Sequence, residues 1–306
     1  MLDYVKTHDG RYVRVDRVGT GKKIVVLVHG LGGGSHMWMP FALSNTAEFT
    51  YIMPNLRGFG KSETVPIYNR DDIFLDFARD LDSVINHYRG TNKVILCGVS
   101  AGAITSMRYF QVFGTGAVER YLNVDQSPKN MNNDGWSWGI GGVRLFQMFE
   151  DIGDRVNTLD QYINKPLCAI DAHKQIEFLG AITDFFETAF HRKLEKFLVR
   201  KMFRIPLIGK LAKKFTQVHN WETYCSCIVS YRANDYDFRD LMKNIDIPVT
   251  LFVGKYSELF PPEGQWHMAR HSATTKVVDF NEGHALMWTA PFTFNRAFKK
   301  FLHEQQ

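Results

Sequence analysis

The stretch Val94-Ile95-Leu96-Cys97-Gly98-Val99-Ser100-Ala101-Gly102 decides the fold. Its apolar first half is typical of a strand buried on both faces of a parallel sheet, and a helical stretch begins near Ala101. Between them, the pattern G-x-S-x-G has the strand-turn-helix context that a nucleophilic serine requires. The turn is sharp, and its backbone passes so close to neighbouring chain that a Cβ at either glycine would collide. We therefore predict that Ser100 is a nucleophile presented above the sheet.

Alternating strands and helices extend from this turn in both directions. The apolar runs 24–28 and 49–53 are typical of further buried strands, and 73–88 has the period of a helix. A hairpin that turns at Asp9-Gly10 opens the chain. Later strands are expected at 121–124, 249–253 and 277–280, before a closing helix over 292–303. This order predicts an α/β fold with a doubly wound, mostly parallel sheet.

A long insertion interrupts the second half of that pattern. Roughly 120 residues separate the strands at 121–124 and 249–253, far more than a usual loop of a few residues. We therefore predict a core of residues 1–127 and 245–306, and a mostly helical cap of residues 128–244. The aromatic side chains of the cap favour a substrate with an apolar acyl or aryl group. The residues expected to contact the substrate are Trp38, Trp136, Trp138 and Trp221, and further cap side chains that could line the pocket are Phe146, Met148, Phe149, Phe178, Phe185, Phe186, Phe190 and Tyr224.

Two more motifs relate the chain to a known family. His29-Gly30-Leu31-Gly32-Gly33-Gly34 follows an early strand, and Asn55-Leu56-Arg57-Gly58-Phe59-Gly60-Lys61-Ser62 follows the next one. With the serine motif, they make nearly the whole chain resemble the α/β-hydrolase fold superfamily, in its branch of cap-containing esterases and non-haem chloroperoxidases. The resemblance implies an oxyanion hole formed by the N–H groups of Leu31 and Ala101. It also implies a structural role for the loop 55–62, where Asn55 replaces the usual Asp, while His29 is expected to brace its own loop.

The general base is expected near the end of the chain, because the triad of this fold follows the order serine, acid, histidine. Gly283-His284 follows the strand at 277–280. We predict that the His284 imidazole takes the proton of Ser100 during attack and returns it to the leaving group.

The acid departs from the common pattern of the family. Members often read G-x-x-D-x-x-x-P after the seventh strand, whereas Gly254 to Pro261 has Ser257 at the Asp position. Serine cannot supply the charge that stabilises an imidazolium ion. Some relatives carry the acid after the sixth strand, and Asp125 stands at that place. We favour Asp125, with Glu258, next to the usual position, as the alternative.

A serine nucleophile favours acyl transfer through an acyl-enzyme. The predicted function is hydrolysis of a carboxylic ester or lactone of a small, hydrophobic substrate, for which neither a metal nor an organic cofactor is expected. An acyltransferase or perhydrolase that uses the same triad is one alternative. The other is a ligand-binding protein that keeps the fold without turnover, and the serine at position 257 is the feature that supports it.

The net charge of +5 is concentrated in one segment. Residues 192–214 contain nine Lys or Arg and one Glu, which leaves a net charge of −3 for the rest. The segment predicts an amphipathic basic helix with its apolar stripe packed on the core and its cations in solvent. A weak contact with a membrane surface, or attraction of an anionic substrate, is the alternative. The members of the stripe are Leu194, Phe197, Leu198, Met202 and Ile205, and the cations between them are Arg192, Lys193, Lys196, Arg200 and Arg204.

Other features of the composition exclude several classes of protein. No nucleic-acid-binding motif accompanies the basic segment, so we expect no nucleic-acid partner. The four cysteines are too few and too irregularly spaced for a disulfide framework or a zinc site, and we expect reduced thiols. The first residues lack the pattern of a signal peptide, which favours a cytoplasmic location. The oligomeric state has no signature in the sequence.

Overall fold

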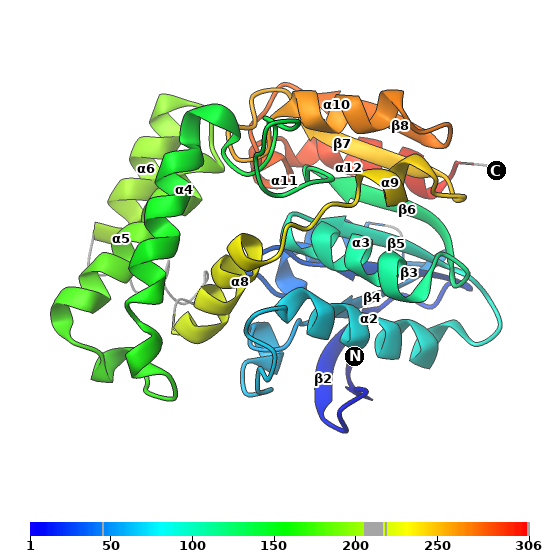
Figure 1. Cartoon of the computed structure of the whole chain (residues 1–306). Helices are drawn as coiled ribbons and strands as arrows, with labels where there is room; N and C mark the ends of the chain where they lie inside the picture. The colour runs from blue at the N-terminus through cyan, green and yellow to red at the C-terminus, as the bar shows by residue number, and fades with distance from the viewer. Residues whose placement is uncertain (45, 205–216, 218, 305–306) are drawn as a thin grey trace.

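The computed structural model describes residues 1–44, 46–204, 217 and 219–304. Within this part of the chain, an eight-stranded sheet with the strand order β1-β2-β4-β3-β5-β6-β7-β8 forms the centre of the molecule (Figure 1). The strands are β1 (Leu2–Lys6), β2 (Tyr12–Val18), β3 (Lys23–Val28), β4 (Phe49–Pro54), β5 (Val94–Val99), β6 (Val118–Val124), β7 (Val249–Gly254) and β8 (Thr275–Phe280).

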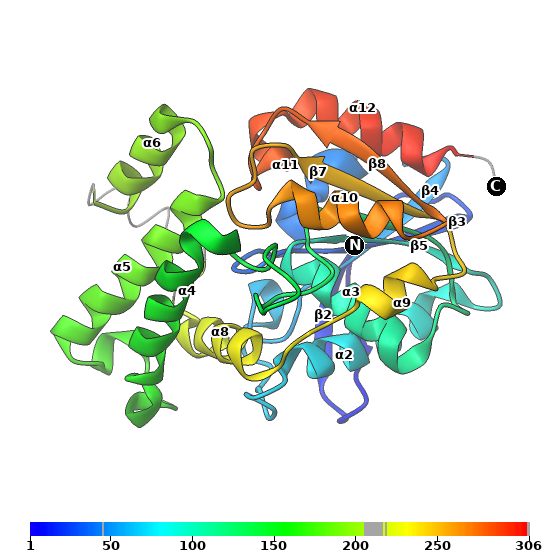
Figure 2. The same ribbon diagram turned by 45° about the horizontal axis from the view of Figure 1, so that its top comes forward.

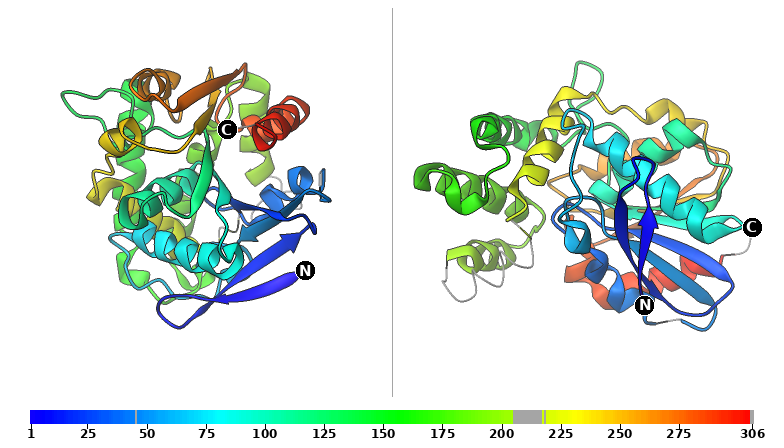
Figure 3. Two further views of the ribbon diagram at one scale, coloured as in Figure 1. Left: turned by 90° about the vertical axis from the view of Figure 1, so that its right-hand side faces the viewer. Right: turned by 90° about the horizontal axis from the view of Figure 1, so that it is seen from below.

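Most of the sheet is parallel, as its apolar runs predict. The β1–β2 hairpin lies at one edge of the sheet (Figure 3), and β2 pairs antiparallel with β4. All pairs from β4 to β8 are parallel. Every residue of β4, β5 and β7 is buried, because helices cover both faces of a parallel sheet. The doubly wound α/β fold predicted from the sequence is confirmed.

Two strands begin earlier than the apolar pattern indicates. β6 begins at Val118 instead of residue 121, because the buried Arg120 is accommodated by an ion pair with Glu119 and a hydrogen bond to the Phe301 carbonyl. β8 begins at Thr275 instead of residue 277, and its side chains are less buried than those of β7. Charged and polar residues at strand starts therefore conceal the true boundaries from a search for apolar runs.

Helices cover both faces of the sheet and pack two separate apolar clusters against it. One cluster lies under α2 and α3, and the other lies under α1, α11 and α12. The core helices are α1 (Met39–Ala42), α2 (Ile73–Arg89), α3 (Ala101–Phe113), α10 (Pro262–Arg270), α11 (Leu286–Thr289) and α12 (Pro291–Leu302). Short 3-10 helices are η1 (Ser35–Met37), η2 (Gly60–Ser62), η3 (Asp160–Tyr162) and η4 (Leu167–Ala169).

The chain between β6 and β7 is mainly helical in its described part. Its helices are α4 (Gly142–Asn157), α5 (Ala172–Thr188), α6 (Lys193–Arg204), α8 (Trp221–Ala233) and α9 (Arg239–Lys243). In Figures 1 and 2, α4, α5 and α6 stand beside the sheet, whereas α9 lies over the core. The predicted cap boundaries at 127/128 and 244/245 stay a prediction.

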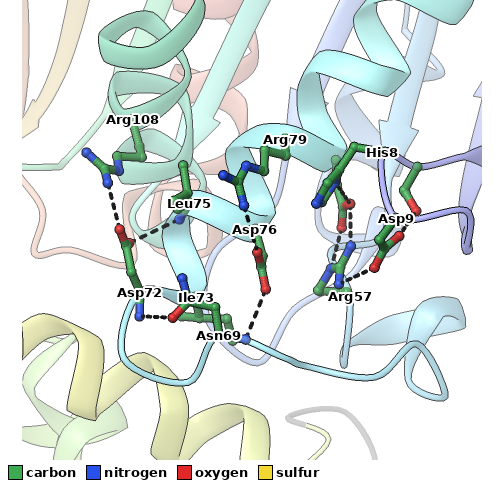
Figure 4. A network of polar contacts seen from close by, with 12 residues as sticks. His8, Asp9, Arg57, Asn69, Asp72, Ile73, Leu75, Asp76, Arg79 and Arg108 are labelled. Carbon is green, nitrogen blue, oxygen red and sulfur yellow. Dashed lines mark hydrogen bonds and ion pairs between the residues drawn. The ribbon is translucent and has the colours of Figure 1, made fainter.

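The loop 55–62 is tied to the hairpin and to α2 through Arg57. The buried guanidinium donates to both oxygens of Asp80, at 2.7 and 2.6 Å, and to Asp9 at 3.0 Å. Burial alone would raise the pKa of Asp9, but hydrogen bonds from Thr7 and Arg57 lower it to about 2. Figure 4 shows the contacts of Arg57 with its carboxylate partners, beside the contacts that Asp72 and Asp76 form with their neighbours. The loop is therefore a structural link, as the sequence predicts.

The orientation of α6 contradicts the expected packing of the basic segment. Leu194, Phe197 and Leu198 are exposed, whereas the cations of the opposite face pair with carboxylates of neighbouring elements. The inner side of the helix holds these ion-paired cations and the buried Val199, so the stripe is turned outward. The side chains of Met202 and Arg204, and residues 205–214, lie outside the described part.

The cysteines and the helices add two further observations. All four cysteines are free, and Cys97, Cys225 and Cys227 are buried while Cys168 is exposed. Among the described residues, each helix is too short or too polar to span a lipid bilayer.

Candidate active site

Ser100 lies in a strained turn between β5 and α3. Its backbone has φ 52° and ψ −120°, a conformation that non-glycine residues rarely adopt. A Cβ at Gly98 would lie 2.5 Å from the Gly102 carbonyl oxygen, and a Cβ at Gly102 would lie 2.4 Å from the Val28 carbonyl oxygen. The two glycines are thus required for space, as the sequence motif predicts. The serine hydroxyl is presented at the carboxyl ends of the parallel strands.

Two backbone N–H groups stand beside the serine. Ala101 is the first residue of α3, where N–H groups have no partner within the helix and the helix dipole is positive. The loop after β3 approaches closely, because a Cβ at Gly30 would lie 3.4 Å from the Ser100 Cβ. Neither the Leu31 nor the Ala101 N–H donates a hydrogen bond to a described residue. Both groups are therefore free to bind an oxyanion, and their role there stays a prediction.

His29 holds the loop after β3 in place. One ring nitrogen, Nδ1, lies 2.8 Å from the Gly30 carbonyl oxygen, and the other, Nε2, accepts the Leu56 N–H at 3.0 Å. Burial lowers the pKa of His29 to about 4, so the ring is neutral near pH 7 with its proton on Nδ1. This histidine therefore braces the loop and is unsuited to act as the base.

Asp125 and His284 meet at the carboxyl edge of the sheet. Asp125 follows β6 with φ 50°, and His284 follows β8. The Asp125 Oδ2 atom lies 2.8 Å from His284 Nδ1. The carboxylate can only accept, so Nδ1 carries the proton and Nε2 is left as an acceptor. An acceptor nitrogen is what the base of a serine nucleophile needs, and His284 and Ser100 line the same cavity.

Four donors surround the buried Asp125 carboxylate. Oδ1 accepts from the Gly254 N–H at 2.8 Å and from Gln265 Nε2 at 3.0 Å. Oδ2 accepts from the Ser257 hydroxyl at 2.7 Å, besides His284. Ser257 occupies the place of the usual acid and donates to the acid of the neighbouring strand. Neither this role of Ser257 nor that of Gln265 is marked by a motif in the sequence.

Glu258 is directed to other partners. It forms an ion pair with Lys196 at 2.5 Å and lies 3.7 Å from Arg144. The hydrogen bond of His284 goes to Asp125 instead. The alternative acid of the sequence analysis is therefore engaged with cations of α6 and α4.

The cavity above Ser100 has a volume of about 290 Å³ and an almost entirely apolar lining. Ser100, His284 and His36 are its polar side chains, and the described lining includes no Asp, Glu, Lys or Arg. Phe185, Phe186 and Phe190 line it, as the aromatic cap suggested. The remaining lining residues are Gly30, Leu31, Gly32, Gly33, Met37, Val99, Ala189, Val199, Leu259, Ala285, Met287 and Trp288. In the described part of the chain, no three His, Cys, Asp or Glu side chains are grouped as a metal ion would need.

The four tryptophans expected to contact the substrate do not line this cavity. Trp38 is buried in the core, where its indole donates to the Val28 carbonyl at 3.0 Å. Trp136 and Trp138 pack on each other and on His267. Trp221 donates to the Lys165 carbonyl at 3.0 Å, at another surface depression. The structure therefore places none of the four at the cavity that Ser100 lines, and their assignment as binding residues stays a prediction that this cavity does not support.

Trp288 is the tryptophan at the cavity, and sequence reasoning missed it. It lies in α11, four residues after His284. This short helix places the side chain in the lining of the same cavity as His284. Its spacing from His284 is the one signal that could have identified it.

Comparisons with known proteins agree with this architecture. Residues 23–137 match the family model described as alpha/beta hydrolase fold. A proline iminopeptidase of Saccharolobus solfataricus is 22% identical over 96% of this chain and 89% of its own length. Among solved structures, an esterase from Exiguobacterium antarcticum is 19% identical with a TM-score of 0.75, covering 99% of this chain and 100% of the other. A bromoperoxidase from Bacillus anthracis is 20% identical with a TM-score of 0.74, again over 99% and 100% of the two chains. The chain thus has the α/β-hydrolase fold.

Proposed function

We propose that this α/β-hydrolase-fold chain is a serine hydrolase that cleaves a carboxylic ester or lactone of a neutral, hydrophobic substrate. One observation carries the proposal. The strained Ser100 and the Asp125-bonded His284 line one cavity, and that cavity is apolar. The fold and the esterases among its structural neighbours agree with this chemistry.

The geometry suggests a reaction in two stages. The Ser100 oxygen attacks the substrate carbonyl carbon while His284 Nε2 takes the hydroxyl proton, and Asp125 stabilises the resulting imidazolium. The Leu31 and Ala101 N–H groups bind the oxyanion of the tetrahedral intermediate. His284 then protonates the leaving alcohol as the carbon–oxygen bond breaks. Water, activated by the same histidine, releases the acid from the acyl-enzyme.

The lining of the cavity supports a neutral substrate. A carboxylate or ammonium group would lose its hydration there without gaining an opposite charge, because the described lining has none. This favours an ester over a peptide with a free terminal ammonium. The apolar side chains of α5 and α11 suit an alkyl or aryl group. The free, mostly buried cysteines suit a reducing compartment, and we include a cytoplasmic location in the proposal.

The first experiment measures hydrolysis of p-nitrophenyl esters of varied chain length by the wild type and by Ser100→Ala. A fluorophosphonate probe followed by mass spectrometry identifies the labelled residue. We expect turnover and labelling that Ser100→Ala abolishes. Ser106→Ala is the matched control, since this buried serine of α3 donates to the Gly102 carbonyl, does not line the cavity and should leave both signals intact. A folded protein that neither labels nor hydrolyses would support the ligand-binding alternative.

A matched pair of substrates tests the neutral specificity. p-Nitrophenyl butyrate and the p-nitrophenyl monoester of succinate have similar length, and only the second carries a carboxylate. We expect kcat/KM to be at least about tenfold higher for the neutral ester, because burying an unpaired charge is costly. Equal values would contradict the assigned substrate class while leaving the nucleophile untouched. Product analysis with added methanol or hydrogen peroxide separates hydrolysis from acyl transfer and perhydrolysis.

A further inference from the structure

The outward side of α6 carries an exposed apolar stripe. Leu194, Phe197 and Leu198 are 67%, 53% and 55% exposed. These residues fall on one side of the helix, together with Lys201, which lies over the Phe197 ring at 5.5 Å. Lys193 is also exposed, at the start of the same helix. We call these five residues the α6 face.

Ion pairs hold the inner side of α6 against neighbouring elements. Arg192, just before the helix, pairs with Glu282 at 2.9 Å, and Lys196 pairs with Glu258 at 2.5 Å. Val199 is buried and lines the cavity. The acidic residue within α6, Glu195, accepts a hydrogen bond from Arg192 at 2.7 Å. The helix is thus held with its apolar side outward.

The mouth of the cavity lies next to this helix. Val199 of α6 and Trp288 both line the cavity, and Trp288 is still 42% exposed. Figures 1 and 2 show α6 at the upper end of the group of helices that stands beside the sheet. Apolar side chains are therefore exposed both on α6 and at the entrance to the apolar cavity.

We propose that the α6 face docks on an anionic lipid surface. Leu194, Phe197 and Leu198 would enter the boundary between headgroups and acyl chains, while Lys193 and Lys201 contact anionic headgroups. The charge pattern favours this occupant, because the cations of the inner side are neutralised by Glu282, Glu258 and Glu187 and the two outward lysines remain beside the stripe. The cytoplasmic leaflet carries such anionic lipids. A hydrophobic substrate dissolved in that layer would reach the cavity without crossing water.

This inference goes beyond the proposed function, and its test does not depend on turnover. Purified protein is sedimented with vesicles of phosphatidylcholine alone and with vesicles that also contain phosphatidylglycerol. We expect binding to the anionic vesicles that weakens with added salt. The double variant Phe197→Ser/Leu198→Ser should bind at least about tenfold more weakly, because it loses apolar insertion.

Phe113→Ser is the matched control. Phe113 is an exposed phenylalanine at the end of α3, at the opposite edge of the sheet from Ser100, and its replacement should leave vesicle binding unchanged. Hydrolysis of a soluble short ester is measured for the same proteins and should be the same in the double variant and the wild type. If the enzyme assay fails but vesicles bind, the proposed function alone is wrong.

Two outcomes would overturn the docking proposal. One is the absence of binding to anionic vesicles, or binding that the double variant retains. The other is a dimer, detected by light scattering, that the double variant dissociates, because the α6 face would then be occupied by a second copy of the chain.

Discussion

At the scale of single residues, the carboxylate that is hydrogen-bonded to His284 follows β6, whereas the position after β7 holds Ser257. The ends of β6 and β7 lie side by side, so a carboxylate after either strand can reach the loop after β8. Ser257 places a polar group after β7 and donates to Asp125. Despite the serine at position 257, His284 is therefore hydrogen-bonded to a buried carboxylate, and Ser257 donates to that same carboxylate.

One pair of substitutions tests whether Asp125 or Glu258 supports His284 in the reaction. Asp125→Asn should lower kcat by about 10³- to 10⁴-fold, because the amide cannot stabilise the imidazolium and favours the wrong tautomer. Glu258→Gln should change kcat less than about threefold, since it weakens partly exposed ion pairs with Lys196 and Arg144. Steady-state kinetics on a neutral ester measures both. Equal losses in the two variants would mean that Glu258 acts in the reaction.

At the scale of secondary-structure elements, the serine turn depends on close packing between α3 and β3. The helix begins directly at the turn, and Gly102 in its first turn contacts the backbone of β3. The position of Ser100 is therefore set by the distance between a helix and a strand that are far apart in sequence. By contrast, α6 is positioned by ion pairs and presents its apolar side outward.

The packing of α3 predicts the effect of a single methyl group. Gly102→Ala should lower the free energy of unfolding by about 2 kcal/mol or more, because the new Cβ would lie 2.4 Å from the Val28 carbonyl oxygen. The same change should lower kcat, since the turn at Ser100 must shift. Gly116→Ala is the control, because a Cβ there meets no atom within 4 Å. Chemical denaturation measures both variants, and equal stabilities would show that α3 can relax without cost.

At the scale of the whole molecule, buried ionisable groups make stability depend on pH. His29 is buried in the loop that follows β3 and lines the cavity, and its pKa is lowered to about 4. The unfolded chain takes up a proton on this imidazole near its ordinary value of 6.5, whereas the folded chain does so only near 4. The unfolded state therefore binds more protons between these values, and stability falls as the pH decreases through this window.

The free energy of unfolding should decrease by about 3 kcal/mol from His29 alone between pH 6.5 and pH 4. Urea denaturation at a series of pH values measures the slope. The His29→Gln variant should show a flatter dependence, whatever its absolute stability. An unaltered slope in His29→Gln would assign the pH dependence to other groups.

The sequence determined the features that local patterns encode. Apolar runs and helical periods marked the parallel strands and their crossover helices, because burial on two faces leaves continuous apolar stretches. The glycines around Ser100 and the position of Gly283-His284 marked the turn and the histidine, because their spacing reflects backbone constraints within a few residues. Asp125 was identified by its place after the sixth strand, although sequence reasoning left Glu258 open.

Tertiary structure decided which of these side chains meet. The choice of Asp125 as the partner of His284 depends on two loops 159 residues apart, and no local pattern reports their distance. The tryptophans of the cap pack on partners that the sequence could not specify, and Trp288 lines the cavity instead. The direction of α6 followed from carboxylates on distant loops, which pair with its cations. Helical periodicity shows that a helix has two sides, but only the surface it packs against determines which side is buried.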